Sequence, residues 1–584
     1  MAWDWDLSYL YKGFDDPAFA DDLARLPGLT DAMKQAVDAT LAPKEKLEAL
    51  VSADDTLSAV LDRLASFCQL TMSVDATNEK AAQYMDKILL VYNDFSLLES
   101  AFSRYVGALD NLDEVIASSP KLNEIGFALR WMARMSRHMM SEAIEPWMLK
   151  MQLSGGNAFS QLRDKLDGTH LVSYRGQELP LAAVRGMAYD VDPAVRKDAY
   201  EAELASYRKM ELPMSFCLNA IKMEARTLAE AQGYESVLDM TLQQSRMDRQ
   251  TLDAMWTAIG EYLPHFRRYL RAKGAYLGHT DGLPFYDLFA PVGKSGKTYT
   301  VDEARAKLVS EMRKFTPVMG EFIDQAFANH WIDMFPKAGK TGGAFCSSYH
   351  PANRSSILTN FQGSFSDVST LAHELGHAWH SRQMAGLPLM MTHEPMPLAE
   401  TASIFNETLL SHLVLEKADD QERFSLLESS LMEATQTVVD IYSRFLFESE
   451  VVDTRADHSM SVEELKDAML RAQEASYGDG LDKNLRHPYM WACKSHYYSS
   501  GLNFYNFPYA FGLLFGKGVF AQYLQKGDAF VPVYNQLLRS CGSDTVANVA
   551  ASVGIDVRSV DFWRSSLEVI KKDIDTFCEL CQRM

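Results

Sequence analysis

Two histidines and a glutamate in one short stretch have the spacing needed to bind and use a metal ion. The stretch reads His373-Glu374-Leu375-Gly376-His377. Residues four apart lie on one face of an α-helix, so both imidazoles can bind the same ion. Glu374 then lies about 100° further round the helix, beside the metal. A carboxylate in that place can take a proton from an attacking water. The spacing therefore predicts a catalytic metal centre.

A catalytic zinc ion usually takes three protein ligands and keeps a fourth position for water. The segment that follows the motif offers three candidates for the third ligand, His393, Glu394 and Glu400. We prefer Glu400, because a helix predicted over residues 398–417 would hold its carboxylate rigidly. Glu407 would lie on the same helix face, one layer back, and could orient a ligand. His393 and Glu394 stay open as alternatives.

A helix must present the two histidines. The apolar run over residues 368–378 predicts that helix, and Ser366 and Asp367 are candidate N-cap residues in front of it. His380 also falls on the face of His373 and His377. It lies two turns beyond His373, so we expect it to pack or to orient other groups and not to bind the metal.

Two short strands are predicted directly before this helix. They cover residues 344–350 and 355–361, are joined by a turn at residues 351–354, and lead into the helix through Gly363. A sheet edge beside the metal could pair with the backbone of an extended peptide. A purely structural hairpin is an equally good interpretation of the sequence.

Three blocks of sequence resemble one known family, the thimet-oligopeptidase-like zinc peptidases of peptidase family M3, and within it the oligoendopeptidase F branch. The similarity covers roughly residues 190–520. The blocks are Asp367 to Ala378, Ala399-Glu400-Thr401-Ala402-Ser403 with Asn406-Glu407, and His496-Tyr497-Tyr498 followed by Phe504 to Gly512.

The resemblance implies a zinc-dependent metalloendopeptidase that hydrolyses internal bonds of unfolded oligopeptides by metal-activated water. It implies one zinc ion per chain, bound by His373, His377 and Glu400, with Glu374 as the general base. One alternative is a zinc carboxypeptidase of similar helical fold, which would need a free substrate C-terminus. Another is a catalytically inactive peptide-binding relative, against which the intact Glu374 argues.

The tetrahedral intermediate of such a reaction needs hydrogen-bond donors besides the metal. By resemblance, His496 and Tyr505 would assist the transition state. Tyr498 and Tyr509 would serve there or in substrate positioning. The same segment is rich in phenylalanine, so packing in an aromatic core is an equal alternative for any single tyrosine.

The length of 584 residues exceeds that of one compact core, so we expect at least two lobes. Helical periodicity dominates the chain, which predicts a mostly α-helical protein. The family resemblance implies a two-lobed zincin with a small sheet beside the zinc helix and a deep cleft or channel. A second hairpin, predicted over residues 171–181, could mark the boundary between an N-terminal helical lobe, residues 1–190, and a catalytic domain, residues 191–584.

The charge and the cysteines bound the partners and the location. The net charge of −21 argues against nucleic acid or an anionic membrane as a partner. Apolar runs are too short for a membrane helix, and the N-terminus has no signal-peptide pattern. Seven cysteines without a disulfide framework fit a reducing compartment. We therefore expect a cytoplasmic protein whose partners are oligopeptides. The sequence leaves its oligomeric state open.

Overall fold

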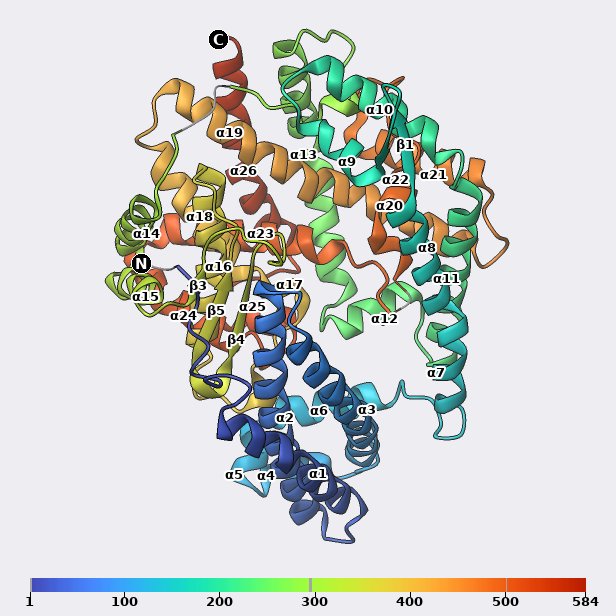
Figure 1. Cartoon of the computed structure of the whole chain (residues 1–584), viewed down its shortest axis with the longest axis vertical. Helices are drawn as coiled ribbons and strands as arrows, with labels where there is room; N and C mark the ends of the chain where they lie inside the picture. Colours follow the sequence, from blue (N-terminus) through green and yellow to red (C-terminus); the bar gives the residue numbers. More distant parts are fainter. Residues whose placement is uncertain (1–2, 294–296, 500, 584) are drawn as a thin grey trace. The chain divides into compact units, whose positions relative to one another are not determined.

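The computed structural model describes residues 3–293, 297–499 and 501–583, and it is mostly helical with small sheets, as predicted (Figure 1). The chain forms two compact units, each assembled from three separate segments. The first unit contains Met1–His138, Gly296–Leu413 and Gln522–Gly554, and the second contains Met139–Ser295, Val414–Ala521 and Ile555–Met584. This division does not test the predicted domain boundary at residue 190, which stays a prediction, as does the predicted cleft between lobes.

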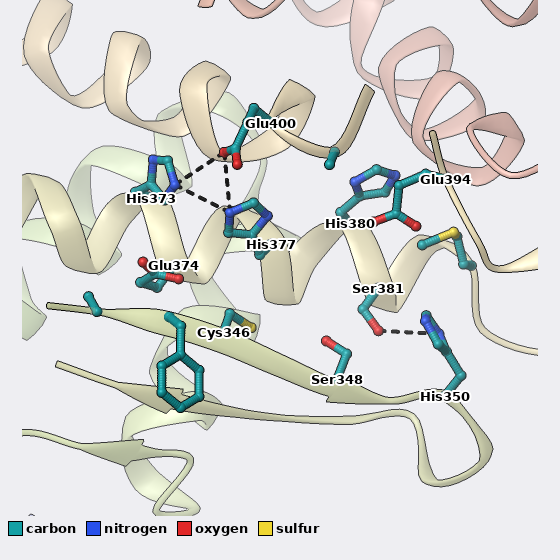
Figure 2. Close-up of a pocket in the computed structure, with 14 residues that line it drawn as sticks. Cys346, Ser348, His350, His373, Glu374, His377, His380, Ser381, Glu394 and Glu400 are labelled. Atoms are coloured by element: carbon teal, nitrogen blue, oxygen red, sulfur yellow. Dashed lines mark hydrogen bonds and ion pairs between the residues drawn. The ribbon is translucent and has the colours of Figure 1, made fainter. Parts of the chain in front are cut away.

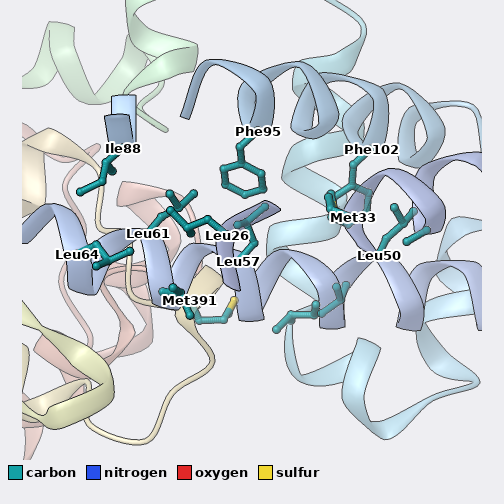
Figure 3. Close-up of a cluster of buried hydrophobic side chains, with 14 of the residues drawn as sticks. Leu26, Met33, Leu50, Leu57, Leu61, Leu64, Ile88, Phe95, Phe102 and Met391 are labelled. Carbon is teal, nitrogen blue, oxygen red and sulfur yellow. The ribbon is translucent and has the colours of Figure 1, made fainter. Parts of the chain in front are cut away.

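The first unit begins with a helical bundle. Its helices are α1 (Pro17–Asp38), α2 (Pro43–Val74), α3 (Glu79–Gly107), α4 (Leu112–Ala117), α5 (Pro120–Glu124) and α6 (Gly126–Ser136). Leucines of α2 recur at helical spacing, so one face of α2 is apolar and packs between α1 and α3. Figure 3 shows this core, which Met391, from the segment after the zinc helix, joins. The bundle therefore packs against part of the chain that forms the site.

A three-stranded sheet follows in the same unit, after α14 (Val301–Phe315) and α15 (Pro317–Ala328). Its strands are β3 (Ile332–Asp333), β4 (Phe345–Tyr349) and β5 (Arg354–Leu358), in the order β3-β5-β4. β4 and β5 form the predicted antiparallel hairpin, and Asn353 in its turn has a φ of 48°, a conformation that asparagine tolerates well. Among the described strands, β4 pairs on one side only and is an edge strand.

The helix that carries His373 and His377 is α16 (Phe365–Gln383), which contacts β4 and β5. Its N-cap is Ser364, so the prediction of Ser366 or Asp367 as the cap is wrong. The Ser364 hydroxyl accepts a hydrogen bond from the Asp367 amide, and the Asp367 carboxylate accepts one from the Ser364 amide. Because of this capping box, the helix begins at Phe365, about one turn before the predicted start at residue 368. Gly363, with a φ of 95°, makes the turn into it.

The predicted continuous helix over residues 398–417 is also wrong. The structure has a short α17 (Met396–Ala399), then Glu400, then α18 (Thr401–Leu415). Glu400, with φ −86° and ψ 5°, ends α17, and its carbonyl accepts the hydrogen bond of the Ile404 amide at 3.1 Å at the start of α18. Glu400 therefore lies at a break between two helices. The unit ends with the last turn of α23 (Phe507–Lys526), α24 (Val531–Ser540) and α25 (Val546–Ser552).

The second unit is almost entirely helical, apart from the predicted hairpin of β1 (Leu171–Tyr174) and β2 (Gln177–Pro180). The longest helices, α13 and α26, pack against each other. Its helices are α7 (Glu145–Ser154), α8 (Gly156–Thr169), α9 (Leu181–Gly186), α10 (Pro193–Tyr207), α11 (Glu211–Ala231), α12 (Val237–Gln244), α13 (Arg249–Tyr276), α19 (Asp420–Thr435), α20 (Ile441–Thr454), α21 (Val462–Tyr477), α22 (Met490–Cys493), most of α23, and α26 (Val560–Cys581).

Candidate active site

Three of the predicted metal ligands form a compact triangle in the first unit (Figure 2). The Nε2 atoms of His373 and His377 lie 3.2 Å apart, and Oε2 of Glu400 lies 3.2 Å and 3.3 Å from them. A tetrahedral zinc ion holds two nitrogen ligands about 3.3 Å apart. The three donors thus have the chemistry and the spacing of a zinc site, with room for a fourth ligand.

Close approach of α16 and α18 brings the glutamate to the histidines. A Cβ atom on Gly376 would lie only 2.6 Å from both the Ala402 carbonyl oxygen and the Cα of Ser403. The glycine therefore lets the two backbones touch. Asn406 on α18 reinforces the contact, since its Nδ2 donates to the Ala372 carbonyl of α16 at 3.3 Å.

Further polar contacts orient the ligands. The Ser403 hydroxyl donates to Oε2 of Glu400 at 2.6 Å. On the far side of His373, Oε2 of Glu407 lies 3.4 Å from Nδ1, and Ser369 donates to the other Glu407 oxygen at 3.5 Å. Partners of this kind fix the tautomer and the ring orientation of a ligand. Glu407 thus lies behind His373, as predicted.

The electrostatics of the triangle match the binding of a cation. Burial opposes protonation of His373, but hydrogen bonds to Glu400 and Glu407 outweigh burial and raise the pKa of His373 to about 11. Burial acts to raise the pKa of Glu400, yet hydrogen bonds from His373 and His377 hold it far below its usual range. In the protein without metal, a proton on His373 therefore offsets part of the negative charge of Glu400 and Glu407. A divalent cation would take that place.

Glu374 lies on the face of α16 that points toward β4. Its side chain is 5% exposed, and its Oε2 atom has no hydrogen-bond partner among the described residues. Figure 2 shows it between the triangle and Cys346 of β4. Burial raises the pKa of Glu374, although the neighbouring histidines act in the opposite direction. An unpaired, desolvated carboxylate beside a metal site has the properties of a general base.

A cavity of about 430 Å³ opens beside these residues and extends along α16 and β4. Glu394, an alternative third ligand, lines its other end beside His380 and lies outside the triangle (Figure 2). His393, the other alternative, is exposed. His380 is 2% exposed, and its Nε2 atom lies 3.1 Å from the Leu538 carbonyl, so it packs in the interior as expected.

The predicted C-terminal residues belong to the second unit, where three of the four gather. The ring of His496 lies 5.2 Å from that of Tyr505 and 6.0 Å from that of Tyr509, and the two tyrosine rings are 5.7 Å apart. Tyr509 is 37% exposed. Tyr498 is only 2% exposed, and its ring packs against the Arg163 guanidinium at 5.4 Å. The structure therefore brings His496, Tyr505 and Tyr509 together and leaves Tyr498 in packed surroundings.

A buried charge network positions the cluster. Nζ of Lys222 lies 2.6 Å from Glu448 and donates to Asn503 at 3.0 Å, and the Phe504 amide donates to the same Glu448 oxygen at 2.9 Å. Phe504 has a φ of 51°, which is strained for a bulky residue and requires such support. Tyr505 follows directly, so its place depends on this network.

Sequence reasoning missed two residues of the first unit that shape the site. Gly376 lies in the middle of a helix, where glycine lowers helix stability. A glycine at such a position indicates that another element packs closely against the helix there. Cys346 lines the cavity beside Glu374. Nothing in the local sequence distinguishes it from the other cysteines.

Known proteins resemble this chain over almost its whole length. Group B oligopeptidase PepB of Streptococcus agalactiae is 24% identical over 583 residues, which is 97% of this chain and 95% of that protein. An oligoendopeptidase F homolog of Lactococcus lactis is 23% identical over 597 residues, 99% of this chain and 97% of its own length. Neither of the two alternatives, the carboxypeptidase and the inactive relative, finds support among the relatives.

Solved structures share the fold. A structure from Chlamydophila abortus, described as that of a peptidase, aligns with a TM-score of 0.87 at 23% identity, covering 99% of this chain and 98% of that one. Oligoendopeptidase-F from Enterococcus faecium aligns with a TM-score of 0.72 at 17% identity, covering 96% and 99%. The model of peptidase family M3 matches residues 186–569, about two thirds of the sequence and all the site residues named above. The chain therefore belongs to peptidase family M3.

Proposed function

We propose that His373, His377 and Glu400 hold one zinc ion, and that Glu374 acts beside it as the general base of peptide hydrolysis. As a member of family M3, the chain is a metalloendopeptidase that acts on oligopeptides. The observation that carries the assignment is the triangle of donor atoms, 3.2–3.3 Å on each side, with the unpaired carboxylate of Glu374 next to it.

Each residue has a defined task in this proposal. When bound, the metal supplies Lewis-acid polarisation of the attacking water and of the scissile carbonyl. Glu374 accepts the proton of the water and passes it to the leaving amine. Its burial supports this use, because a carboxylate with a raised pKa holds the proton long enough to deliver it. Glu407 keeps His373 in the orientation that binding requires.

The edge of β4 is a suitable support for an extended peptide. Phe345, Cys346 and Ser348 of this strand line the cavity beside Glu374, and β4 has one free edge among the described strands. Pairing with the backbone of a substrate would involve few side-chain contacts and so would tolerate many sequences. This favours strand addition over a purely structural hairpin.

His496, Tyr505 and Tyr509 are our candidates for stabilising the transition state. Burial lowers the pKa of His496, and the positive charges of Arg444 and Lys494 act in the same direction. A neutral imidazole and two phenols can donate hydrogen bonds to a developing oxyanion. Tyr498 remains a prediction from sequence without such support.

The proposed location is the cytoplasm, with oligopeptides as substrates and neither nucleic acid nor a membrane as a partner. All seven cysteines are free thiols, which fits a reducing compartment. Within the described residues, no helix has the length and apolar character needed to cross a membrane. The net charge of −21 argues against nucleic acid as a partner.

Cleavage of an internally quenched peptide, blocked at both ends, tests the function. We expect internal cleavage by the wild-type protein, with loss of nearly all turnover after chelation and in Glu374→Gln. The Glu374→Gln protein should bind as much zinc as the wild type, since Glu374 is not part of the triangle. Release of residues only from peptides with a free C-terminus would instead establish a carboxypeptidase.

A further inference from the structure

A second cluster of metal-binding side chains lies in the interior of the second unit. It consists of Glu203 on α10, His487 in the segment before α22, and Cys493 at the end of α22. One donor atom from each lies within 4.8 Å of the other two, and all three residues are buried. Among the described residues, only this cluster and the triangle of His373, His377 and Glu400 have such an arrangement.

The separations in the cluster match those around a tetrahedral ion. Nε2 of His487 lies 3.4 Å from Oε1 of Glu203, and Sγ of Cys493 lies 3.6 Å from the same oxygen. With ordinary bond lengths, a tetrahedral zinc ion separates an oxygen from a nitrogen ligand by about 3.3 Å, and from a sulfur ligand by about 3.5 Å. These two separations fit a shared ion, and a donor atom of His487 and Sγ of Cys493 lie within 4.8 Å of each other.

The histidine of this cluster is short of partners for a buried imidazole. His487 is 1% exposed, its Nε2 atom has only the 3.4 Å ion-pair contact with Glu203, and its Nδ1 atom makes no hydrogen bond to any described residue. Buried polar groups of native proteins are rarely left without a partner, and each such group calls for an explanation. Its ring lines a cavity of about 300 Å³, which Glu203 also lines. A ligand can therefore reach both side chains.

From this geometry we propose that Glu203, His487 and Cys493 form a second binding site, for a thiophilic divalent cation such as zinc. A thiolate ligand favours zinc or cobalt over magnesium or calcium. Binding replaces the thiol proton of Cys493, which passes to solvent. Three protein ligands leave a fourth position, open to water from the cavity. The site is independent of the proposed peptidase function.

The surrounding charges set how tightly the cation is held. Nε of Arg185 lies 3.2 Å from Glu203, and Lys494 also lines the cavity, so positive charge already surrounds the cluster. This weakens binding relative to the triangle of the first unit. Tyr207 acts in the other direction, because its hydroxyl donates to Glu203 at 3.1 Å and lies 2.8 Å from Sγ of Cys493, fixing both ligands in place.

An ion at this site would tie together parts of the chain that are distant in sequence. Glu203 comes from α10, whereas His487 and Cys493 come almost 300 residues later. Cys493 lies three residues before His496, so the ion would anchor the segment that leads to the His496 cluster. The role we infer is structural, with a measurable effect on thermal stability.

Cobalt gives a direct test, because a cysteine thiolate bound to Co²⁺ produces a charge-transfer band in the near ultraviolet. The triangle of the first unit contains no cysteine and cannot give this band. The metal-free full-length protein is titrated with Co²⁺, and bound cobalt is counted by elemental analysis. We expect two ions per chain and the band in the wild-type protein. Glu400→Ala should keep one ion and the band.

Variants of the cluster complete the test. Cys493→Ser and His487→Gln should each keep one ion, lose or strongly weaken the band, and lose the metal-dependent rise in melting temperature. Cys217→Ser, which changes another buried cysteine of the same unit, should behave as the wild type.

A wild-type protein that binds one ion without the band would overturn the proposal. So would a second ion without the band, or a band that persists in Cys493→Ser. If a variant fails to fold, the wild-type band and ion count still decide.

Discussion

Identical side chains six residues apart, Glu394 and Glu400, differ in what they can bind because of where the backbone puts them. Glu400 lies against both histidines of α16, whereas Glu394 lines the far end of the same cavity. The sequence left both open as the third ligand. The choice depends on how α18 packs against α16, and Asn406, which donates to the Ala372 carbonyl, holds these two helices together.

Replacing each glutamate in turn tests this distinction. Glu400→Ala removes one corner of the donor triangle. Loss of a residue that only orients a ligand lowers metal affinity by at most about 100-fold, so we expect the zinc affinity of the triangle to fall by more than that. Glu394→Ala should leave zinc affinity unchanged. Competition with a chromophoric chelator measures both. Full zinc affinity in Glu400→Ala would refute the ligand set.

The two tyrosines Tyr505 and Tyr498 should respond differently to loss of the hydroxyl. Tyr505 belongs to the cluster with His496 and Tyr509, so Tyr505→Phe removes a candidate donor to the oxyanion and should lower kcat by about 100- to 1000-fold with little change in KM. Tyr498 is packed against Arg163, and Tyr498→Phe should keep kcat within a factor of about two. Steady-state kinetics on the quenched peptide separates them. Equal losses in two well-folded variants would contradict the assignment.

At the scale of elements, the sequence predicts the helices and turns that are determined by local residue patterns. The spacing of His373 and His377 identified α16, and the turn residues around Asn353 identified the β4–β5 hairpin. The His496 cluster could only be inferred from family resemblance, since more than 100 residues separate it from the zinc helix and no local pattern links them. The close contact of α16 with α18 also escaped prediction, because which helices touch is decided by packing.

That contact can be tested at Gly376. Gly376→Ala would place a methyl group 2.6 Å from backbone atoms of α18, so the two helices must separate and carry Glu400 away from the histidines. We expect weaker zinc binding and a loss of stability on the order of 1–3 kcal/mol, as for other overpacked contacts. Chelator competition and thermal unfolding measure the two effects.

Gly260→Ala is the matched control for this change. Gly260 is an exposed glycine within α13, and a Cβ atom there would meet no atom within 4 Å. Alanine should therefore stabilise the protein by about 0.4–1 kcal/mol through the unfolded state. Unchanged zinc affinity in Gly376→Ala would show that the helices do not determine the position of Glu400.

At the scale of the whole molecule, composition and periodicity predict the helical class and more than one compact unit. They do not reveal that each unit is assembled from three separate segments. Long-range pairing of this kind depends on which apolar faces fit together, and many helices of this chain have similar faces. The stability of the whole chain also depends on charged residues buried within those apolar faces, and Asp54 is one of them.

Asp54 lies on α2, within the stripe that also holds Leu50, Leu57 and Leu61, and it is 6% exposed. Burial, together with the negative charges of Glu99, Asp55 and Asp62, raises the pKa of Asp54 to about 7. In the unfolded chain an aspartate has a pKa of about 3.9. Between about pH 4 and pH 7, the folded protein therefore binds one proton at Asp54 that the unfolded chain does not bind. The stabilisation is complete below about pH 4 and is lost as the pH rises through about 7.

Asp54→Asn should remove this dependence, because an asparagine carries no charge to bury. We expect the variant to match the wild type at pH 4 and to be more stable at pH 8, by at most about 4 kcal/mol, the equivalent of three pKa units. Melting temperatures of the metal-free proteins across this range measure the difference, and chelation keeps zinc binding from adding its own pH dependence. Asp21→Asn, at an exposed position of α1, changes the net charge equally and controls for the reduction of overall repulsion. If the two variants gain the same stability at pH 8, the effect belongs to the net charge of the molecule and not to the buried carboxylate.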